Sequence, residues 1–309
     1  MTLQQLEYIV ALDTYKHFVT AAENCNVTQP TLTMQVKKLE EEIGIILFDR
    51  NQKPLRPTKA GKPFIRKARQ VIREMNELNE MILTDKNSIS GTYRLAIIPT
   101  LAPFLIPLFL PEFLLKHENL NLGISELPTN EIIRNFNGDE IDMAILSTPL
   151  DEKNLVEIPL FYEPFLLYLP DGHKLIKYDK IPPEIISSDE LLLLNEGHCF
   201  REQALKICSK SSTGPHSNFN YRSGSIESLM RLTDKNMGYT LVPELSVPNT
   251  QKKDNIKRLT SPEPSREISL VVHRTFTKER LVNELKNTIL SSIPVHLRQS
   301  DNVTKVGWK

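Results

Sequence analysis

The apolar pattern of this chain changes near residue 90. The first ninety residues have a helical pattern with few glycines and many charges, whereas short apolar runs alternate with amphipathic stretches from Thr92 onward. Strands that alternate with helices predict α/β units with largely parallel sheets. The expected strands are 93–99, 120–127, 142–146, 165–169, 191–194, 239–242 and 268–273, and the expected helices are 129–136, 201–208, 226–233 and 278–290.

The charge and cysteine content narrow the class of protein further. In this 309-residue chain 38 Lys and Arg balance 38 Asp and Glu, so binding to nucleic acid depends on where the charges lie. Three cysteines, Cys25, Cys199 and Cys208, are too few for a disulfide scaffold and indicate a reducing cytosol. The longest apolar run, 97–115, contains four prolines and Glu112, which would break a membrane-spanning helix repeatedly. We therefore expect a cytoplasmic protein with no membrane partner.

Three short helical patterns open the chain, and the third has the features of a DNA-recognition helix. Thr28 is placed to cap it, Pro30 lies in its first turn and Gly44 follows its end. Its apolar residues recur at spacings of 4, 3 and 4 from Leu32 to Ile43, which buries one face and turns the other toward solvent. Hydroxyl and amide side chains backed by lysines suit a major groove. The expected DNA contacts on this helix are Gln29, Pro30, Thr31, Thr33, Gln35, Lys37 and Lys38.

A basic loop with several prolines follows this helix. It presents Arg50, Lys53, Arg56 and Lys59, and we expect the first three to contact DNA. Between residues 37 and 73 there are 11 Lys or Arg and 4 Asp or Glu, and 11 minus 4 leaves +7 in a neutral chain. A solvated helical face is the ordinary explanation of such a charge run. The turn, the outward polar helix and the basic loop occur together, which favours a DNA-binding domain.

The same region carries a set of residues at fixed positions: Phe18, Ala21, Ala22, Val27, Thr28, Gln29, Pro30, Leu32, Leu39, Glu40, Gly44, Leu47, Phe48, Arg50, Thr58, Ala60 and Gly61. In these the chain resembles the LysR-type family of bacterial transcription regulators. The resemblance implies a winged helix-turn-helix over residues 1–60 and double-stranded promoter DNA as the partner. Met34 stands where the family frequently has arginine, so the base preference of other members does not transfer.

A heptad pattern occupies residues 61–90. Its apolar positions recur at spacings of 4, 3, 4, 3 and 4 and are flanked by charges. The pattern fits either an amphipathic helix on its own core or a helix that pairs with a second copy. The family resemblance implies the second, a dimer-forming linker helix that presents two recognition helices to a pseudo-palindromic site. The expected dimer contacts are Phe64, Ala68, Val71, Met75, Leu78 and Ile82.

The segment 195–208 combines a histidine, two cysteines and a helical pattern. His198 and Cys199 open that pattern. Amide dipoles at a helix N-terminus lower the pKa of a thiol, and His198 with Arg201 can add positive charge. The thiolate is nucleophilic, and hydrogen peroxide oxidises it to sulfenic acid. Cys25, by contrast, fits an apolar core position between the N-terminal helices.

Cys199 and Cys208 are nine positions apart. In a continuous helix their Cα atoms would lie about 13 to 14 Å apart, whereas a disulfide needs roughly 4.4 to 6.8 Å. If the two cysteines are partners, oxidation must refold the segment between them, as a redox switch requires. Two separate core residues are the alternative. A metal site with His198 lacks a fourth ligand at suitable spacing, so neither a metal nor a cofactor is expected.

Further motifs lie at Pro99 and Thr100, at Thr129, and at 262–266, in addition to the segment around Cys199. In these the chain resembles the hydrogen-peroxide-sensing members of the LysR-type family. The resemblance implies that Cys199 is the peroxide-reactive cysteine and that Cys208 resolves it as an intramolecular disulfide. Ordinary explanations remain, with the two threonines as helix caps and the arginine as a loop cation. The expected peroxide-binding residues are Thr100, Thr129, His198, Arg201 and Arg266.

The resemblance also implies the architecture. We expect an α/β regulatory domain of two Rossmann-like lobes, similar to periplasmic binding proteins, joined to an all-α winged helix-turn-helix by the linker helix. Lobe I is expected over 91–162 and 267–300, lobe II over 163–266, and a polar tail over 301–309.

The expected function is control of oxidative-stress defence genes by a non-enzymatic, peroxide-switched regulator. Its expected partners are promoter DNA, hydrogen peroxide, RNA polymerase, further copies in a homodimer or homotetramer, and a thiol reductant. Its expected location is the bacterial cytoplasm, at the nucleoid. Two other functions fit the residues. One is a regulator whose cleft binds a small effector while the cysteines are incidental, and the other is a peroxidase that turns over.

Overall fold

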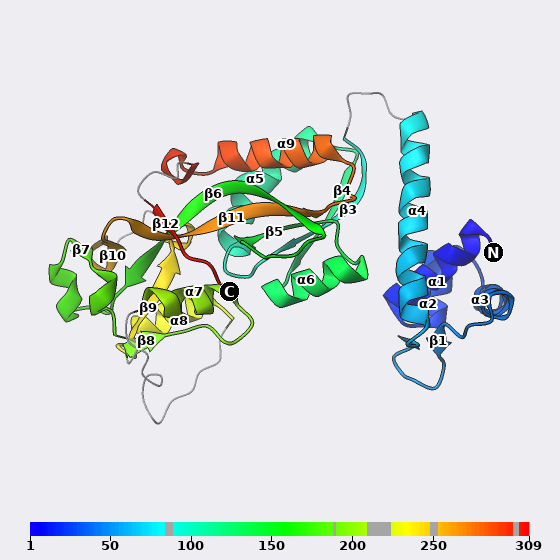
Figure 1. The fold of residues 1–309 in the computed structure, drawn as a ribbon, viewed down its shortest axis with the longest axis horizontal. Helices are drawn as coiled ribbons and strands as arrows, with labels where there is room; N and C mark the ends of the chain where they lie inside the picture. The colour runs from blue at the N-terminus through cyan, green and yellow to red at the C-terminus, as the bar shows by residue number, and fades with distance from the viewer. Residues whose placement is uncertain (84–88, 188–189, 209–223, 248–252, 299–302, 309) are drawn as a thin grey trace. The chain divides into compact units, whose positions relative to one another are not determined.

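The structure is a computed structural model that describes residues 1–83, 89–187, 190–208, 224–247, 253–298 and 303–308. The chain forms two compact units, Met1–Ser88 and Ile89–Lys309. Their elements are labelled and coloured along the chain in Figure 1.

The first unit contains a helix-turn-helix, a two-stranded wing and a long helix. Thr28 caps α3, because its hydroxyl oxygen accepts a hydrogen bond from Thr31 N at 3.4 Å. Gly44 ends α3 with a φ of 69°, in the left-handed region that favours glycine. An added Cβ at Gly61 would lie 2.1 Å from the carbonyl oxygen of Leu47, so only glycine fits where α4 begins. The elements are α1 (Leu3–Tyr15), α2 (Phe18–Asn24), α3 (Gln29–Ile43), β1 (Phe48–Asp49), β2 (Arg56–Pro57) and α4 (Gly61–Leu83).

The second unit is an α/β structure whose described residues form a ten-stranded sheet. Its central order is β4-β3-β5-β11-β6-β10-β7, with β12 paired to β11, and β9 paired to β6 and β8. The strands are β3 (Gly91–Ile97), β4 (Leu120–Glu126), β5 (Met143–Thr148), β6 (Leu155–Tyr168), β7 (Lys180–Ile181), β8 (Leu191–Leu192), β9 (Tyr239–Pro243), β10 (Ile256–Leu259), β11 (Glu263–His273) and β12 (Val303–Lys305). The α-helices are α5 (Ala102–Lys116), α6 (Thr129–Gly138), α7 (Cys199–Ile207), α8 (Ile226–Thr233) and α9 (Glu279–Ser292).

The sheet is mixed, so the prediction of largely parallel sheets holds only in part: among its described residues, five strand pairs are parallel and four are antiparallel. β3 pairs in parallel with β4 and β5, but β11 is antiparallel to both β5 and β6. β6 is also antiparallel to β9 and β10. The cause is the long antiparallel pair β6 and β11, whose full lengths the apolar runs did not reveal.

Two hydrophobic cores define two lobes within this unit. The core of lobe I gathers side chains from β3, β5, β11, α5 and α9, whereas the core of lobe II gathers side chains from β8, β9, α7 and α8. β6 contributes to both cores, since Phe161 belongs to the first and Phe165 to the second. In Figure 1, α5 and α9 lie together on one side of the lobe I sheet.

The end of the chain is structured, so the prediction of a polar tail is wrong for the described residues 303–308. β12 pairs in parallel with β11, and Val306 N donates to Ser265 O at 2.9 Å. Trp308 packs against the core of lobe I, and Val306 packs against that of lobe II. The β-branched Val303 and Thr304 suit a strand, and the edge of β11 supplies its partner.

Candidate functional site

Cys199 lies at the junction of the two lobes. It is the first residue of α7, with His198 as the N-cap, and its side chain is 3% exposed. Cys199 belongs to the core of lobe I, whereas the next apolar residues of the helix, Phe200 and Ala204, belong to the core of lobe II. The start of α7 therefore meets side chains from both lobes.

Thr100 and Thr129 come from two other elements, and neither caps a helix. The N-cap of α5 is Leu101 and that of α6 is Pro128, and neither has a side-chain cap. Both threonines are buried. Within the described part of the chain, Thr129 Oγ1 makes no hydrogen bond of normal geometry. The hydroxyl nevertheless interacts with the Cys199 thiol and acts to lower the pKa of that thiol. The helix-cap explanation of these residues is thus wrong.

Arg266 is fully buried in β11 and paired with Glu163 of β6. Its Nε and Nη2 donate to Glu163 Oε2 at 3.0 and 2.8 Å. Its Nη1 and Nη2 donate to the hydroxyl and carbonyl oxygens of Thr100 at 2.8 and 3.1 Å. The guanidinium carbon lies 5.3 Å from the ring centre of Phe200, which in turn packs on Phe165 at 5.0 Å. Arg266 is therefore a buried cation of the site, not a loop cation.

Burial opposes ionisation of the Cys199 thiol. It raises the pKa of Cys199, while the Thr129 hydroxyl, the charge of Arg266 and the backbone amides of Cys199 and Phe200 act to lower it. The expected helix-end effect is present, but burial outweighs it. The reduced site therefore holds a protonated thiol with groups around it that favour the thiolate.

Arg266 supplies positive charge beside the thiol, whereas His198 does not. Burial lowers the pKa of His198, so this imidazole is neutral near pH 7. Arg201 donates from Nη1 to the carbonyl oxygen of Leu194 at 2.8 Å. The prediction that His198 adds positive charge beside the thiol is therefore wrong, and the same prediction for Arg201 stays a prediction. His198 remains adjacent to Cys199 as a neutral, buried ring.

Cys208 lies at the other end of α7. It caps the helix, its side chain is 9% exposed, and it belongs to the core of lobe II. Burial raises the pKa of its thiol to about 11. Cys199, Cys208 and the half-buried Cys25 are all free thiols.

The C-terminal segment holds the middle of α7. Gln203 is fully buried, and its Nε2 donates to Ser147 Oγ at 3.0 Å and to the carbonyl oxygen of Val306 at 2.6 Å. Lys305 pairs with Glu267 of β11. α7 is thus attached to β5 in lobe I and to the residues that follow β12.

The outward face of α3 differs in part from the prediction. Gln29, Pro30, Lys37 and Lys38 are exposed, while Thr31, Thr33 and Gln35 are half-buried. Gln35 Oε1 accepts from Gln5 Nε2 at 3.2 Å, which turns this amide toward α1. Met34 is 60% exposed on α3 and was not among the expected contacts. Met34 lies midway between the buried Leu32 and Val36, and this helical spacing places it on the outward face.

The cations of the wing differ in their surroundings, since one arginine is held by other side chains and two other basic residues are exposed. Arg50 Nη2 pairs with Glu40 Oε2 at 2.8 Å and lies over the ring of Phe18 at 5.9 Å, so it fastens the wing to α2 and α3. Lys53 and Arg56 are exposed. An open hollow of about 1060 Å³ separates the end of α3 from the wing, and its lining includes Lys37, Arg50, Arg56 and Lys59.

The apolar heptad positions of α4, which are the expected dimer contacts, fall into two groups. Phe64 and Ala68 pack on the core of the first unit, whereas Val71, Met75 and Leu78 are exposed. The side chain of Ile82 lies outside the described residues. The unpaired apolar stripe of the helix is therefore Val71, Met75 and Leu78.

The described residues include neither a cluster of metal ligands nor a membrane-spanning helix. They contain no three His, Cys, Asp or Glu side chains close enough to hold a metal ion. None of their helices has the length and apolar character that crossing a membrane requires.

Comparisons with known proteins agree with this geometry. Residues 3–62 match the bacterial regulatory helix-turn-helix protein, lysR family, and residues 86–293 match the LysR substrate binding domain. The chain is 36% identical to the hydrogen peroxide-inducible genes activator of Haemophilus influenzae, over 88% of this chain and 90% of that protein. It is 34% identical to the DNA-binding transcriptional dual regulator OxyR of Escherichia coli, over 88% and 89%.

The solved structures give the same result. A full-length OxyR variant from Pseudomonas aeruginosa is similar with a TM-score of 0.83 and 29% identity, over 97% of this chain and 100% of that chain. Reduced OxyR from Porphyromonas gingivalis is similar with a TM-score of 0.62 and 29% identity, over 69% and 100%. The predicted fold, a winged helix-turn-helix with a two-lobed regulatory domain, is confirmed. The chain belongs to the LysR family of bacterial transcriptional regulators, in the group of the OxyR hydrogen peroxide-inducible genes activators.

Proposed function

We propose that this chain senses hydrogen peroxide through Cys199 and Cys208 and controls oxidative-stress defence genes. One observation carries the proposal: the buried Cys199 thiol lies among Thr129, Arg266 and helix amides that favour its thiolate, with a second thiol at the far end of the same helix. The names of the relatives, activators inducible by hydrogen peroxide, support it.

In the first step the Cys199 thiol gives up its proton, and the resulting thiolate attacks one oxygen of hydrogen peroxide. An S–O bond forms and the O–O bond breaks, so sulfur is oxidised to sulfenic acid while the leaving hydroxide takes up a proton and becomes water. The hydroxyls of Thr100 and Thr129 orient the peroxide, and Arg266 stabilises the leaving hydroxide. The neutral ring of His198 can accept or donate one hydrogen bond at the same place.

In the second step the thiol of Cys208 attacks the sulfenic sulfur. An S–S bond forms, the S–O bond breaks and a second water leaves, so one peroxide and two thiols give one disulfide and two waters. The two cysteines end a helix whose length keeps their Cα atoms about 13 to 14 Å apart, and a disulfide tolerates roughly 4.4 to 6.8 Å. Closure therefore requires α7 to unwind, which transmits the chemistry to the packing of both lobes.

The unwinding of α7 affects DNA binding through an assembly of several copies of this chain. The exposed stripe of α4 supports a homodimer, and the exposed Leu108, Leu114 and Leu115 of α5 support a second contact that completes a homotetramer. α3 then reads promoter DNA with Gln29, Pro30, Thr31 and Thr33 while its lysines and the wing residues Lys53 and Arg56 meet phosphates. RNA polymerase is the partner at the promoter, and a thiol reductant of the cytoplasm resets the disulfide.

The test is a peroxide titration of the reduced protein bound to its promoter. We expect the footprint to change with one equivalent of peroxide, and Cys199→Ser to abolish the change while Cys25→Ser retains it. An unaltered response in Cys199→Ser would overturn the proposal. Stabilisation by a metabolite without any peroxide effect would identify an effector-binding regulator instead, and sustained peroxide consumption with a thiol reductant would identify a peroxidase.

A further inference from the structure

Glu163 takes part in the site only through another side chain. It is fully buried in β6. Its Oε2 accepts both hydrogen bonds from Arg266, and its Oε1 accepts from Leu245 N at 2.9 Å. All three partners are donors, so each carboxylate oxygen has to act as an acceptor.

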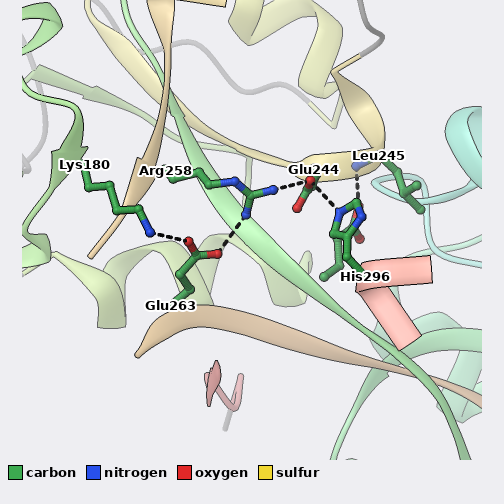
Figure 2. A network of polar contacts seen from close by, with 7 residues as sticks. Lys180, Glu244, Leu245, Arg258, Glu263 and His296 are labelled. Atoms are coloured by element: carbon green, nitrogen blue, oxygen red, sulfur yellow. Dashed lines mark hydrogen bonds and ion pairs between the residues drawn. The ribbon is translucent and has the colours of Figure 1, made fainter. Parts of the chain in front are cut away.

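Leu245 presents a fixed donor because its own short helix is fastened on both sides. Leu245 lies in the 3₁₀-helix Glu244–Ser246, and Figure 2 shows Glu244 between Arg258 and His296. Arg258 lies on β10 of lobe II, whereas His296 lies on the 3₁₀-helix Val295–Arg298, whose Leu297 packs in the core of lobe I. The network continues from Arg258 to Glu263 at 2.8 Å and from Glu263 to Lys180 at 3.6 Å.

The guanidinium group of Arg266 is consequently held by hydrogen bonds along two of its edges. Glu163 binds Nε and Nη2, and Thr100 binds Nη1 and Nη2, while the ring of Phe200 lies near the guanidinium plane. We propose that Glu163 is a positioning residue that fixes the guanidinium of Arg266 in the orientation from which it acts on Cys199. The reaction that this serves is the one proposed above, so the inference rests on that function for its purpose.

An amide cannot replace the carboxylate. In Glu163→Gln one oxygen becomes an NH₂ group that faces either Leu245 N–H or Arg266, and both are donors. The substitution also leaves Arg266 buried without its counter-charge, so the guanidinium is expected to move away from Thr100 and the thiol. Displacing this cation from the thiol removes the opposite charge that favours the thiolate, and such a loss raises the pKa of a thiol by about one unit or more. Cys199 should then titrate about one pH unit higher and react about tenfold more slowly near neutral pH.

The experiment measures alkylation of Cys199 by iodoacetamide against pH in the reduced full-length protein, with the site resolved by peptide mass spectrometry. We expect Glu163→Gln and Arg266→Gln to give the same upward shift, and the double variant to give no further shift. Glu163→Asp keeps the charge and should shift the profile less. Glu157→Gln is the matched control, because Glu157 lies on the same strand and accepts from Leu150 N at 2.8 Å.

Two results would overturn the inference. One is a lower melting temperature of Glu163→Gln with an unchanged alkylation profile, which would make the residue structural only. The other is additive shifts in the double variant. Alkylation does not involve peroxide, so a shifted profile in a protein whose Cys199 ignores peroxide would sustain the positioning role and contradict the proposed function.

Discussion

Cys199 and Cys208 begin and end the same helix but are buried in different hydrophobic cores. Cys199 packs in lobe I and Cys208 in lobe II, and burial raises the pKa of both thiols. A disulfide between them cannot form around an intact α7, so it must withdraw at least one sulfur from its core. Oxidation and lobe packing are thereby coupled through nine residues of helix.

The free energy of unfolding is expected to fall between pH 9 and 11 because of Cys208. Burial raises the pKa of its thiol from 9.0 to about 11 in the folded chain. The folded state thus favours the protonated thiol, and this stabilisation is complete below pH 9 and lost as the pH rises through about 11. Its size is about 3 kcal/mol. Urea unfolding at pH 8 and 11 should show Cys208→Ala losing less stability than the wild type, and equal losses would refute the burial argument.

Two arginines that pair with glutamates should differ in their effect on stability. Arg266→Gln leaves Glu163 as an unpaired buried charge, which is expected to lower the free energy of unfolding by about 3 to 5 kcal/mol. Arg258→Gln should cost about 1 kcal/mol, because the Arg258 side chain is 36% exposed and water screens its ion pairs. Urea unfolding at pH 7 compares them. A loss of the same size in both variants would contradict the role of burial.

Local patterns predicted the helices around the site better than its charges. The segment 226–233 is α8, and the cysteine motif does open α7. The helix-end effect on Cys199 is local and was foreseen, but the burial that outweighs it comes from side chains far along the chain. Glu163 was missed for the same reason, since its partner Arg266 lies 103 positions away.

The long strands were predicted only in part. β6 covers Leu155–Tyr168, of which the apolar run 165–169 is the end. Glu157, Pro159, Glu163 and Pro164 interrupt the apolar pattern before it. Their strand conformation depends on pairing with β11, which no local signal contains. The C-terminal β12 depends on the same partner, so the local sequence of residues 303–305 predicts a tail and not a strand.

Lys38 is expected to contribute to DNA affinity without contributing to sequence choice. It is exposed on α3 among the residues that face outward. Loss of one phosphate contact should weaken binding to every sequence similarly and reduce the slope of log affinity against log salt by about 1. Binding titrations of Lys38→Ala at several salt concentrations measure the slope. Lys153→Ala, an exposed lysine of the regulatory unit, is the control, and an equal effect of both variants would argue against a contact at Lys38.

Leu78→Asp should weaken dimerisation while leaving the fold of each copy intact. Leu78 is exposed at the end of the stripe formed with Val71 and Met75, so a carboxylate there is costly only where another copy covers it. Sedimentation at several concentrations should show a larger dissociation constant. Glu74→Ala on the same helix is the control. Unchanged association of Leu78→Asp would exclude this stripe as the dimer contact.

The most direct test of the switch is a mass-spectrometric map of the three cysteines before and after one equivalent of hydrogen peroxide. We predict free thiols at Cys25, Cys199 and Cys208 in the reduced protein. After peroxide, a Cys199–Cys208 disulfide should appear within one chain while Cys25 stays free. A protein whose DNA footprint responds to peroxide while Cys199 and Cys208 remain unlinked would contradict the account.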